Sequence, residues 1–183
     1  MGDLDTHTEA LGEFTEVGDR WRLRFVRRLA HPPTTVWNAI TQPEHLAAWF
    51  PTDVEGERVA GAALHFSFRD HDLPGFEGEM LVYDAPHVLE MRWGDDTLRF
   101  ELAPTGEGTV LTLLDSFDEL GKASRDGAGW HVCLDQLAYS LAGAEMPWKP
   151  EERWQEVNTA YTQSFGPEAS TLGPPQEWID AHQ

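Results

Sequence analysis

The order of two hydrophobic periods along the chain constrains its fold more than any other feature. Between residues 53 and 117, apolar residues alternate with polar ones in short runs that Gly, Pro and Asp residues separate. From residue 129 to 143, apolar residues instead recur every three or four positions, as at Trp130, Leu134, Leu137 and Leu141. Period two is typical of half-buried strands, and the longer period is typical of an amphipathic helix. The sequence therefore predicts a strand meander followed by one long helix.

A strand and two short helices are expected before the meander. From Trp21 to Leu29, apolar side chains alternate with arginines, and we interpret the arginines at positions 20, 22, 24, 27 and 28 as a solvated strand face. After Pro32-Pro33, two short stretches with helical spacing follow, the first ending at Pro43 and the second at Pro51. We predict an α+β fold: a curved antiparallel sheet of about six to seven strands wrapped on a long C-terminal helix, with a short helix pair after strand 1.

The length of the chain favours a single domain. Its 183 residues can bury one sizeable core, whereas two domains would each be small for independent stability. Residues 1–17 are acidic and show no sustained period, so we predict a flexible acidic arm or a loosely attached edge segment. We assign residues 18–145 to the domain and 146–183 to a C-terminal extension with a helix at about 150–165.

The excess of acidic residues argues against several classes of partner. Thirteen Lys and Arg residues face 32 Asp and Glu residues, and the resulting net charge of −19 repels nucleic acid phosphates and anionic membranes. The sequence shows no long apolar span and no secretory signal, and its single cysteine, Cys133, excludes an intrachain disulfide. We expect a cytoplasmic protein that binds neither nucleic acid nor membrane. Homodimer formation is left open.

Three motifs resemble one branch of a known superfamily. The stretch VRRLAHPPTTVWNAITQPEHLAAWFP has a strand-ending arginine before a proline, a Val-Trp pair and a Trp-Phe pair, GTVLTLLDSF resembles a last strand, and DGAGWHVCLDQLAYSLAG resembles a Gly-Trp helix start. Over about residues 21–143 the chain thus resembles the START-like helix-grip (SRPBCC) superfamily, in the branch of homologues of the heat-shock protein 90 ATPase activator C-terminal domain. The resemblance implies a cavity between the long helix and the concave sheet. It leaves the function open, because the superfamily includes lipid carriers, hormone receptors and polyketide cyclases.

Large apolar residues on both sides of this cavity are candidate ligand contacts. Ligand pockets are typically apolar and aromatic, although the same residues would also fill a closed core. The leading hypothesis is a domain that binds a small apolar, aromatic or lipid-like molecule and needs no cofactor. The predicted ligand-binding residues are Trp37, Trp49, Phe50, Phe66, Phe68, Trp93, Phe117, Trp130, Leu134 and Leu137.

Few residues suggest catalysis. His131 and Asp135 lie one helical turn apart and would form a general base if they faced the cavity, although we favour a surface pair, and Arg92 is the other candidate. The segment Asp70-His71-Asp72 carries metal-binding side chains, but adjacent residues seldom converge on one ion, so no metal site is predicted. A small-molecule-modifying enzyme of the polyketide cyclase type is the first alternative to ligand binding. A chaperone-associated protein, implied by the resemblance alone, is the second.

Overall fold

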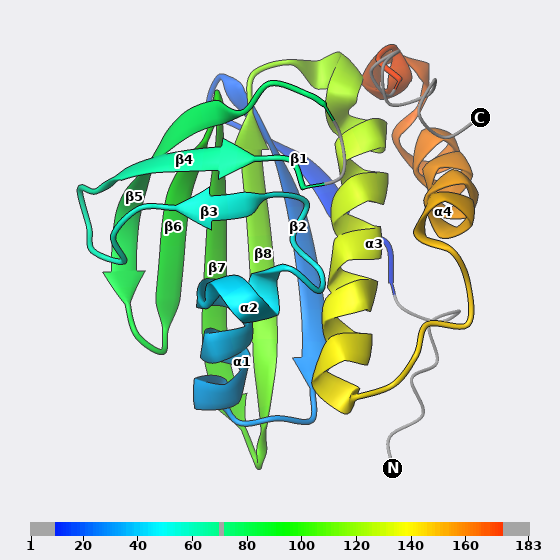
Figure 1. Ribbon diagram of the computed structural model, residues 1–183. Helices are drawn as coiled ribbons and strands as arrows, with labels where there is room; N and C mark the ends of the chain where they lie inside the picture. Colours follow the sequence, from blue (N-terminus) through cyan, green and yellow to red (C-terminus); the bar gives the residue numbers. More distant parts are fainter. Residues whose placement is uncertain (1–9, 70–71, 174–183) are drawn as a thin grey trace.

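A computed structural model describes residues 10–69 and 72–173 (Figure 1). Within these residues, eight antiparallel strands form one curved sheet in the order β1-β2-β8-β7-β6-β5-β4-β3. This is the predicted α+β meander with slightly more strands than expected. The strands are β1 (Glu13–Val17), β2 (Arg20–Leu29), β3 (Asp53–Glu55), β4 (Ala63–Ser67), β5 (Phe76–Asp84), β6 (Val88–Trp93), β7 (Asp96–Thr105) and β8 (Gly108–Phe117).

The helices cover one face of this sheet in two layers. The long helix α3 (Ala123–Ala142) lies along the concave face, and α4 (Pro150–Phe165) packs on its outer side (Figure 1). The expected helix pair, α1 (Pro33–Thr41) and α2 (Pro43–Leu46), follows β2. Short 3-10 turns, η1 (Leu120–Lys122) and η2 (Pro167–Ser170), precede α3 and follow α4. In the described part of the chain, no helix has the length and apolar character needed to cross a membrane.

Helix α3 is longer than its apolar stripe indicated. The helix begins at Ala123, whereas the sequence pattern predicted a start at Gly129. The first turns were missed because their polar residues and glycine give no periodic signal. Its end matches the sequence pattern, since Gly143 follows the last helical residue with a φ of 63°, a left-handed conformation that glycine adopts without steric cost.

The amino-terminal segment differs from the predicted flexible arm. That prediction is wrong for Glu13–Val17, which pair with β2 and form the edge of the sheet, as the alternative of an edge segment anticipated. Aromatic packing explains the order of this strand, since the ring of Phe14 lies 5.2 Å from that of Trp21 and 5.1 Å from that of Phe165 in α4. Residues 1–9 lie outside the described residues.

Not all arginines of strand β2 face the solvent. Leu23, Phe25 and Leu29 are buried as expected, but Arg27 is also buried, which corrects the interpretation of the arginines as one solvated face. Strict alternation in a strand places Arg27 on the same side as Phe25 and Leu29. Its guanidinium donates hydrogen bonds to the backbone oxygens of Ala10 and Val26, at 3.3 and 3.0 Å, so the buried charge has polar partners.

Candidate ligand-binding site

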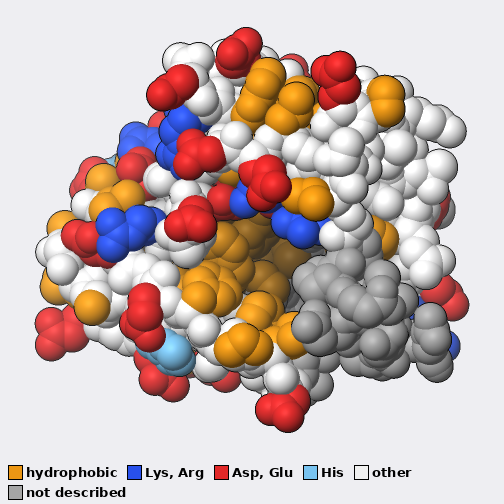
Figure 2. Space-filling view, turned by 90° about the horizontal axis from the view of Figure 1, so that it is seen from above, with side chains coloured by type: hydrophobic (Ala, Val, Ile, Leu, Met, Phe, Trp, Pro, Cys, Tyr) orange, Lys and Arg blue, Asp and Glu red, His pale blue; other side chains and the backbone are white. Residues whose placement is uncertain are grey.

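A pocket of about 710 Å³ opens beside the first half of α3. Its walls come from α3, from residues 47–51 after α2, from the turn between β6 and β7, and from the first turn of α4. Figure 2 shows a hollow lined mainly by hydrophobic side chains, with basic and acidic side chains along one rim. This volume lies within the range of about 300–1,000 Å³ that is typical of small-molecule sites.

Aromatic rings form the rigid wall of this pocket. The ring of Trp93, the last residue of β6, lies 5.1 Å from Phe50, 4.7 Å from Phe66, 4.7 Å from Phe76 and 5.8 Å from Trp130, each in a T-shaped arrangement. Such edge-to-face contacts are favoured by the charge distribution of aromatic rings. The wall therefore joins the segment after α2, the sheet and α3 in one cluster.

A tight turn positions both the aromatic wall and a carboxyl group. Trp93 and Asp96 are opposite each other where β6 pairs with β7, and only Gly94 and Asp95 connect them. Gly94 has a φ of 59°, which other residues rarely adopt. The turn therefore places an indole and a carboxyl group side by side at the same end of the pocket.

A glycine on α3 leaves space in the pocket. Gly129 lines the pocket, and a Cβ atom added there would meet nothing within 4 Å. Gly127, two residues earlier, differs because an added Cβ would lie 3.2 Å from the ring of Tyr161 in α4. The glycine at 127 thus permits helix packing, whereas the glycine at 129 keeps the cavity open.

The predicted ligand contacts divide into two groups of equal size. The first group lines the pocket and comprises Trp49, Phe50, Phe68, Trp93 and Trp130. The second group lies in the enclosed core and comprises Trp37, Phe66, Phe117, Leu134 and Leu137. The pattern of apolar residues identified the concave side, but it did not distinguish core positions from pocket positions. It also missed Phe76, Gly129 and Trp154, which line the pocket as well.

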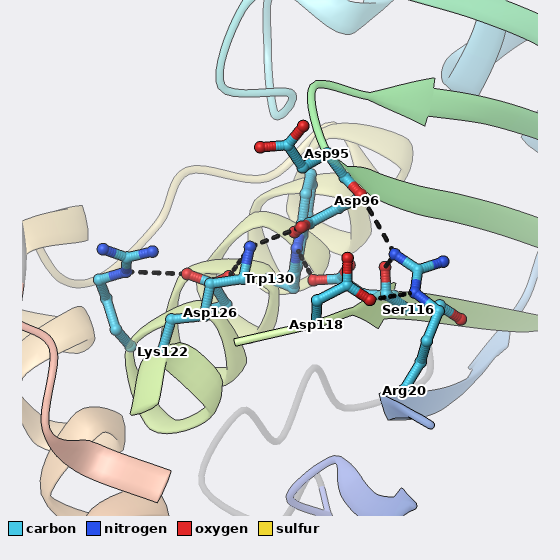
Figure 3. Close-up of polar contacts among 10 residues, drawn as sticks. Arg20, Asp95, Asp96, Ser116, Asp118, Lys122, Asp126 and Trp130 are labelled. Carbon is cyan, nitrogen blue, oxygen red and sulfur yellow. Dashed lines mark hydrogen bonds and ion pairs between the residues drawn. The ribbon is translucent and has the colours of Figure 1, made fainter. Parts of the chain in front are cut away.

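A charged cluster forms the polar end of the pocket (Figure 3). Lys122 Nζ lies 2.5 Å from Asp96 Oδ1 and 3.7 Å from Asp126 Oδ2, and Arg125 Nε donates to Asp126 Oδ1 at 2.9 Å. All four of these residues line the pocket. The carboxylates raise the pKa of Lys122, although burial acts against its charge. The ammonium group therefore supplies the positive charge between two carboxylates.

Asp115 lies behind this cluster and is completely buried. Trp130 Nε1 donates a hydrogen bond to Asp115 Oδ2 at 3.1 Å, while Asp115 Oδ1 has no hydrogen-bond partner among the described residues. Burial raises the pKa of Asp115 well above its usual range, and the nearby charges of Asp96 and Asp126 raise it further. Burial also raises the pKa of Asp96, but the hydrogen bond from Lys122 opposes that change. Of the two carboxyl groups, Asp115 is therefore the one whose surroundings favour the protonated form more strongly.

Sequence reasoning missed Asp115, although the strand pattern contained a signal for it. Leu111, Leu113, Asp115 and Phe117 alternate along β8, and all of them are buried. An aspartate in register with an apolar strand face is rare unless it is paired or protonated. The position of Asp115 on the apolar face of this strand is therefore the sequence signal that identifies it.

His131 and Asp135 are buried on the opposite side of α3, so the favoured interpretation as a surface pair is wrong. Their exposed fractions are 1% and 2%, because α4 covers them. Tyr161 Oη lies 2.9 Å from His131 Nδ1 and accepts a hydrogen bond from the Gly12 amide at 2.8 Å. Arg153 Nε donates to Asp135 Oδ2 at 3.2 Å. Burial and the charges of Arg27 and Arg153 lower the pKa of His131 to about 3.

The three weak catalytic candidates do not meet at the pocket. His131 and Asp135 face α4, and neither lines the cavity. Arg92 precedes Trp93 in β6 and points to the other face of the sheet, where its guanidinium lies 3.1 Å from Glu79. Of the segment once considered for metal binding, Asp70 and His71 lie outside the described residues. The charged residues that line the pocket are instead Lys122 with its neighbours Asp96, Arg125 and Asp126, together with Arg69, Asp95 and Glu151.

Comparisons with known proteins agree with this fold. The family model described as Activator of Hsp90 ATPase homolog 1-like protein matches residues 30–142. A conserved protein of unknown function from Enterococcus faecalis, EF2215, has a TM-score of 0.69 at 18% identity, over 84% of this chain and 89% of that chain. CalU16 from Micromonospora echinospora has a TM-score of 0.66 at 23% identity, over 85% of this chain and 96% of that chain. The protein encoded by BPP1335 from Bordetella parapertussis has a TM-score of 0.65 at 25% identity, over 84% of this chain and 92% of that chain. No curated protein sequence matches the chain.

Proposed function

The chain belongs to the family of Activator of Hsp90 ATPase homolog 1-like proteins, and we propose that this member binds a small, largely apolar aromatic molecule in its pocket. Family membership supplies the helix-grip fold but not the ligand, since folds of this kind carry many functions. The proposal therefore rests on the site itself.

The observation that carries the proposal is an open cavity of about 710 Å³ with a continuous aromatic wall. In this wall Phe50 comes from the segment after α2, Trp93 from the sheet and Trp130 from α3, and the three rings contact one another, so a ligand packed against them would contact three elements at once. Flat rings offer a large contact area at little cost in conformational entropy. A compact aromatic molecule matches such walls better than a flexible chain does.

The glycine at position 129 provides a direct test. Replacing Gly129 by leucine would extend a side chain from α3 into the open space, whereas alanine would add a single methyl group there. Both residues favour a helix over glycine by about 1 kcal/mol at most, so both variants should remain folded. Gly129→Leu thus blocks the pocket, and Gly129→Ala is its matched control.

Binding can be measured by calorimetry with the methyl ether of naphthol, a neutral aromatic probe. We expect the wild-type protein and Gly129→Ala to bind it with similar affinity, and Gly129→Leu to lose at least tenfold, about the effect of 1.4 kcal/mol. Equal binding by Gly129→Leu would show that the probe binds elsewhere. If neither this probe nor a wider panel of neutral aromatic compounds binds the wild-type protein, the proposed function is wrong.

A further inference from the structure

We infer that the polar end of the pocket selects a neutral aromatic ligand that carries a hydroxyl group, which would lie beside the Lys122–Asp96 ion pair and within reach of both groups. This inference rests on the proposed function and specifies the chemical class of the ligand. It starts from two independent features, the open aromatic pocket and the unpartnered oxygen of the fully buried Asp115 behind it.

The charges at this end of the pocket balance one another. Asp96 and Asp126 are in contact with Lys122, and Arg125 also contacts Asp126, so two carboxylates face two cations. Asp115 receives one hydrogen bond, from the Trp130 indole, and its other oxygen has no donor within the described residues. An ionised carboxylate buried in that way would be costly, and a proton on Asp115 removes the cost. The cluster then carries no net charge.

A charged ligand would disturb this balance. A carboxylate placed beside Lys122 would also approach Asp96, whose Oδ1 lies 2.5 Å from the same ammonium group. An ammonium placed beside Asp96 would approach Lys122 in the same way. Asp95 is exposed at the mouth and adds negative charge there, which acts further against an anionic ligand.

A hydroxyl group fits the donors and acceptors that remain. A lysine ammonium has three N–H donors, and the hydrogen bond to Asp96 engages one of them, while Asp126 Oδ2 at 3.7 Å is an ion-pair partner beyond hydrogen-bond distance. A remaining donor can bind a ligand oxygen, and Asp96 can accept the hydroxyl proton of the same ligand. A methyl ether keeps the oxygen that accepts a hydrogen bond from Lys122 but lacks the hydroxyl proton. It therefore makes no hydrogen bond to the Asp96 carboxylate.

Four naphthalene derivatives, all substituted at the same ring position, separate these possibilities: naphthol, its methyl ether, naphthoate and naphthylmethylamine. We expect naphthol to bind wild-type protein about tenfold more tightly than its methyl ether, which corresponds to one hydrogen bond to a charged group. The two charged compounds should bind more weakly than naphthol. Calorimetry at neutral pH gives all four affinities on one protein preparation.

The substitution Asp96→Asn tests the assignment of the polar group. It removes a negative charge and leaves an amide of the same size, so naphthol should lose its advantage over the ether while naphthoate gains affinity. The neighbouring substitution Asp95→Asn is the matched control and should leave the advantage of naphthol over its methyl ether unchanged, because both compounds are neutral and no ion pair or hydrogen bond of the Asp95 side chain connects it to Lys122. Affinity for the methyl ether reports whether each variant keeps an intact aromatic wall.

The outcomes distinguish this inference from the proposed function. If the methyl ether binds as tightly as naphthol, or if a charged compound binds best, the inference is overturned while the aromatic pocket remains a binding site. An unchanged ranking in Asp96→Asn would overturn it as well. If Asp96→Asn does not fold, Asp126→Asn removes a negative charge beside the same ammonium and should also raise the affinity for naphthoate, while naphthol keeps its advantage over the ether because Asp96 is intact. If no compound binds, the proposed function and this inference both fail.

Discussion

Helix α3 separates two buried polar groups that resemble each other in composition and differ in access. The pocket-side cluster consists of Asp96, Asp115, Lys122 and Asp126, and three of its members line an open cavity. The α4-side cluster consists of Arg27, His131, Asp135, Arg153 and Tyr161, and α4 closes it from solvent. Both hold charged groups away from water, but only the pocket-side cluster can meet a small molecule.

The difference shows why spacing within a helix is a weak guide to function. His131 and Asp135 form the pattern expected of an acid-base pair, yet their partners are Tyr161 and Arg153 of α4. These contacts connect α3 to α4 in the C-terminal extension. Tyr161 also accepts a hydrogen bond from the Gly12 amide, which connects the amino-terminal segment to the same cluster. The pocket-side cluster brings together residues from β7, β8 and the start of α3, which no local pattern connects.

The α4-side cluster should give the largest effect on stability. Asp135→Asn removes the buried negative charge beside Arg153, and we expect the free energy of unfolding to fall by about 3 kcal/mol, since the guanidinium loses its buried carboxylate partner. Urea denaturation monitored by circular dichroism measures the change.

Glu156→Gln is the matched control for that experiment. The side chain of Glu156 also contacts Arg153, at 3.0 Å, but it is 61% exposed. We expect this substitution to cost less than about 1 kcal/mol, as is typical of exposed ion pairs. Equal losses in the two variants would contradict the view that burial makes the Asp135 contact important.

The next effect concerns pH. His131 has an ordinary pKa of 6.5 and a pKa of about 3 in the folded protein, so the unfolded chain binds a proton that the folded chain does not. The stability that this histidine contributes is fully present above pH 6.5 and declines as pH falls from there toward 3. The expected slope is about 1.4 kcal/mol per pH unit.

Replacement of the histidine isolates this contribution. Unfolding free energies of the wild-type protein and His131→Gln, measured between neutral pH and pH 5, should diverge because the variant lacks the titrating group. Parallel curves would mean that His131 has the same pKa in the folded and unfolded states, which would contradict the effect of burial described above.

Asp115 should respond to pH in the opposite direction from His131. Because its pKa is raised in the folded state, the unfolded chain releases the proton first, and stability declines as pH rises above the ordinary carboxyl range. Asp115→Asn replaces a protonated carboxyl by a neutral group of similar shape. We expect its stability at neutral pH to lie within about 1 kcal/mol of wild type or above it.

The same urea titration that is used for Asp135→Asn provides the comparison. The free energy of unfolding of Asp115→Asn, relative to that of wild type, should increase as pH rises. A loss of stability as large as that of Asp135→Asn would show that Asp115 is ionised in the folded protein. The inference that the pocket-side cluster carries no net charge would then be wrong.

Much of the fold could be predicted because it depends on local periods. Alternation placed Leu23 and Phe25 inside, and the helical stripe of Trp130 and Leu134 oriented α3 toward the sheet. The strand at residues 76–84 carried apolar residues on both faces, and the structure has a register shift there between Met80 and Val82 that breaks the alternation.

The candidate site could be predicted only in part, because it depends on how separate elements pack. The sequence identified Trp93 and Trp130 as facing residues, but it could not show that Gly129 leaves open space at the wall of the cavity or that Trp154 of α4 reaches the same cavity. Nor could it show which side of α3 would be covered by α4. That choice determines whether a polar residue of α3 meets a ligand or another helix.

The most direct test of the account is an NMR titration that follows the indole N–H signals while naphthol is added. Trp93 and Trp130 line the pocket, whereas Trp21 stacks on Phe14 at the edge of the sheet and does not. We predict that the signals of Trp93 and Trp130 shift in proportion to occupancy, that the signal of Trp21 stays in place, and that Gly129→Leu abolishes the shifts. Unmoved signals for Trp93 and Trp130 at saturating naphthol would contradict the claim that this pocket is the ligand site.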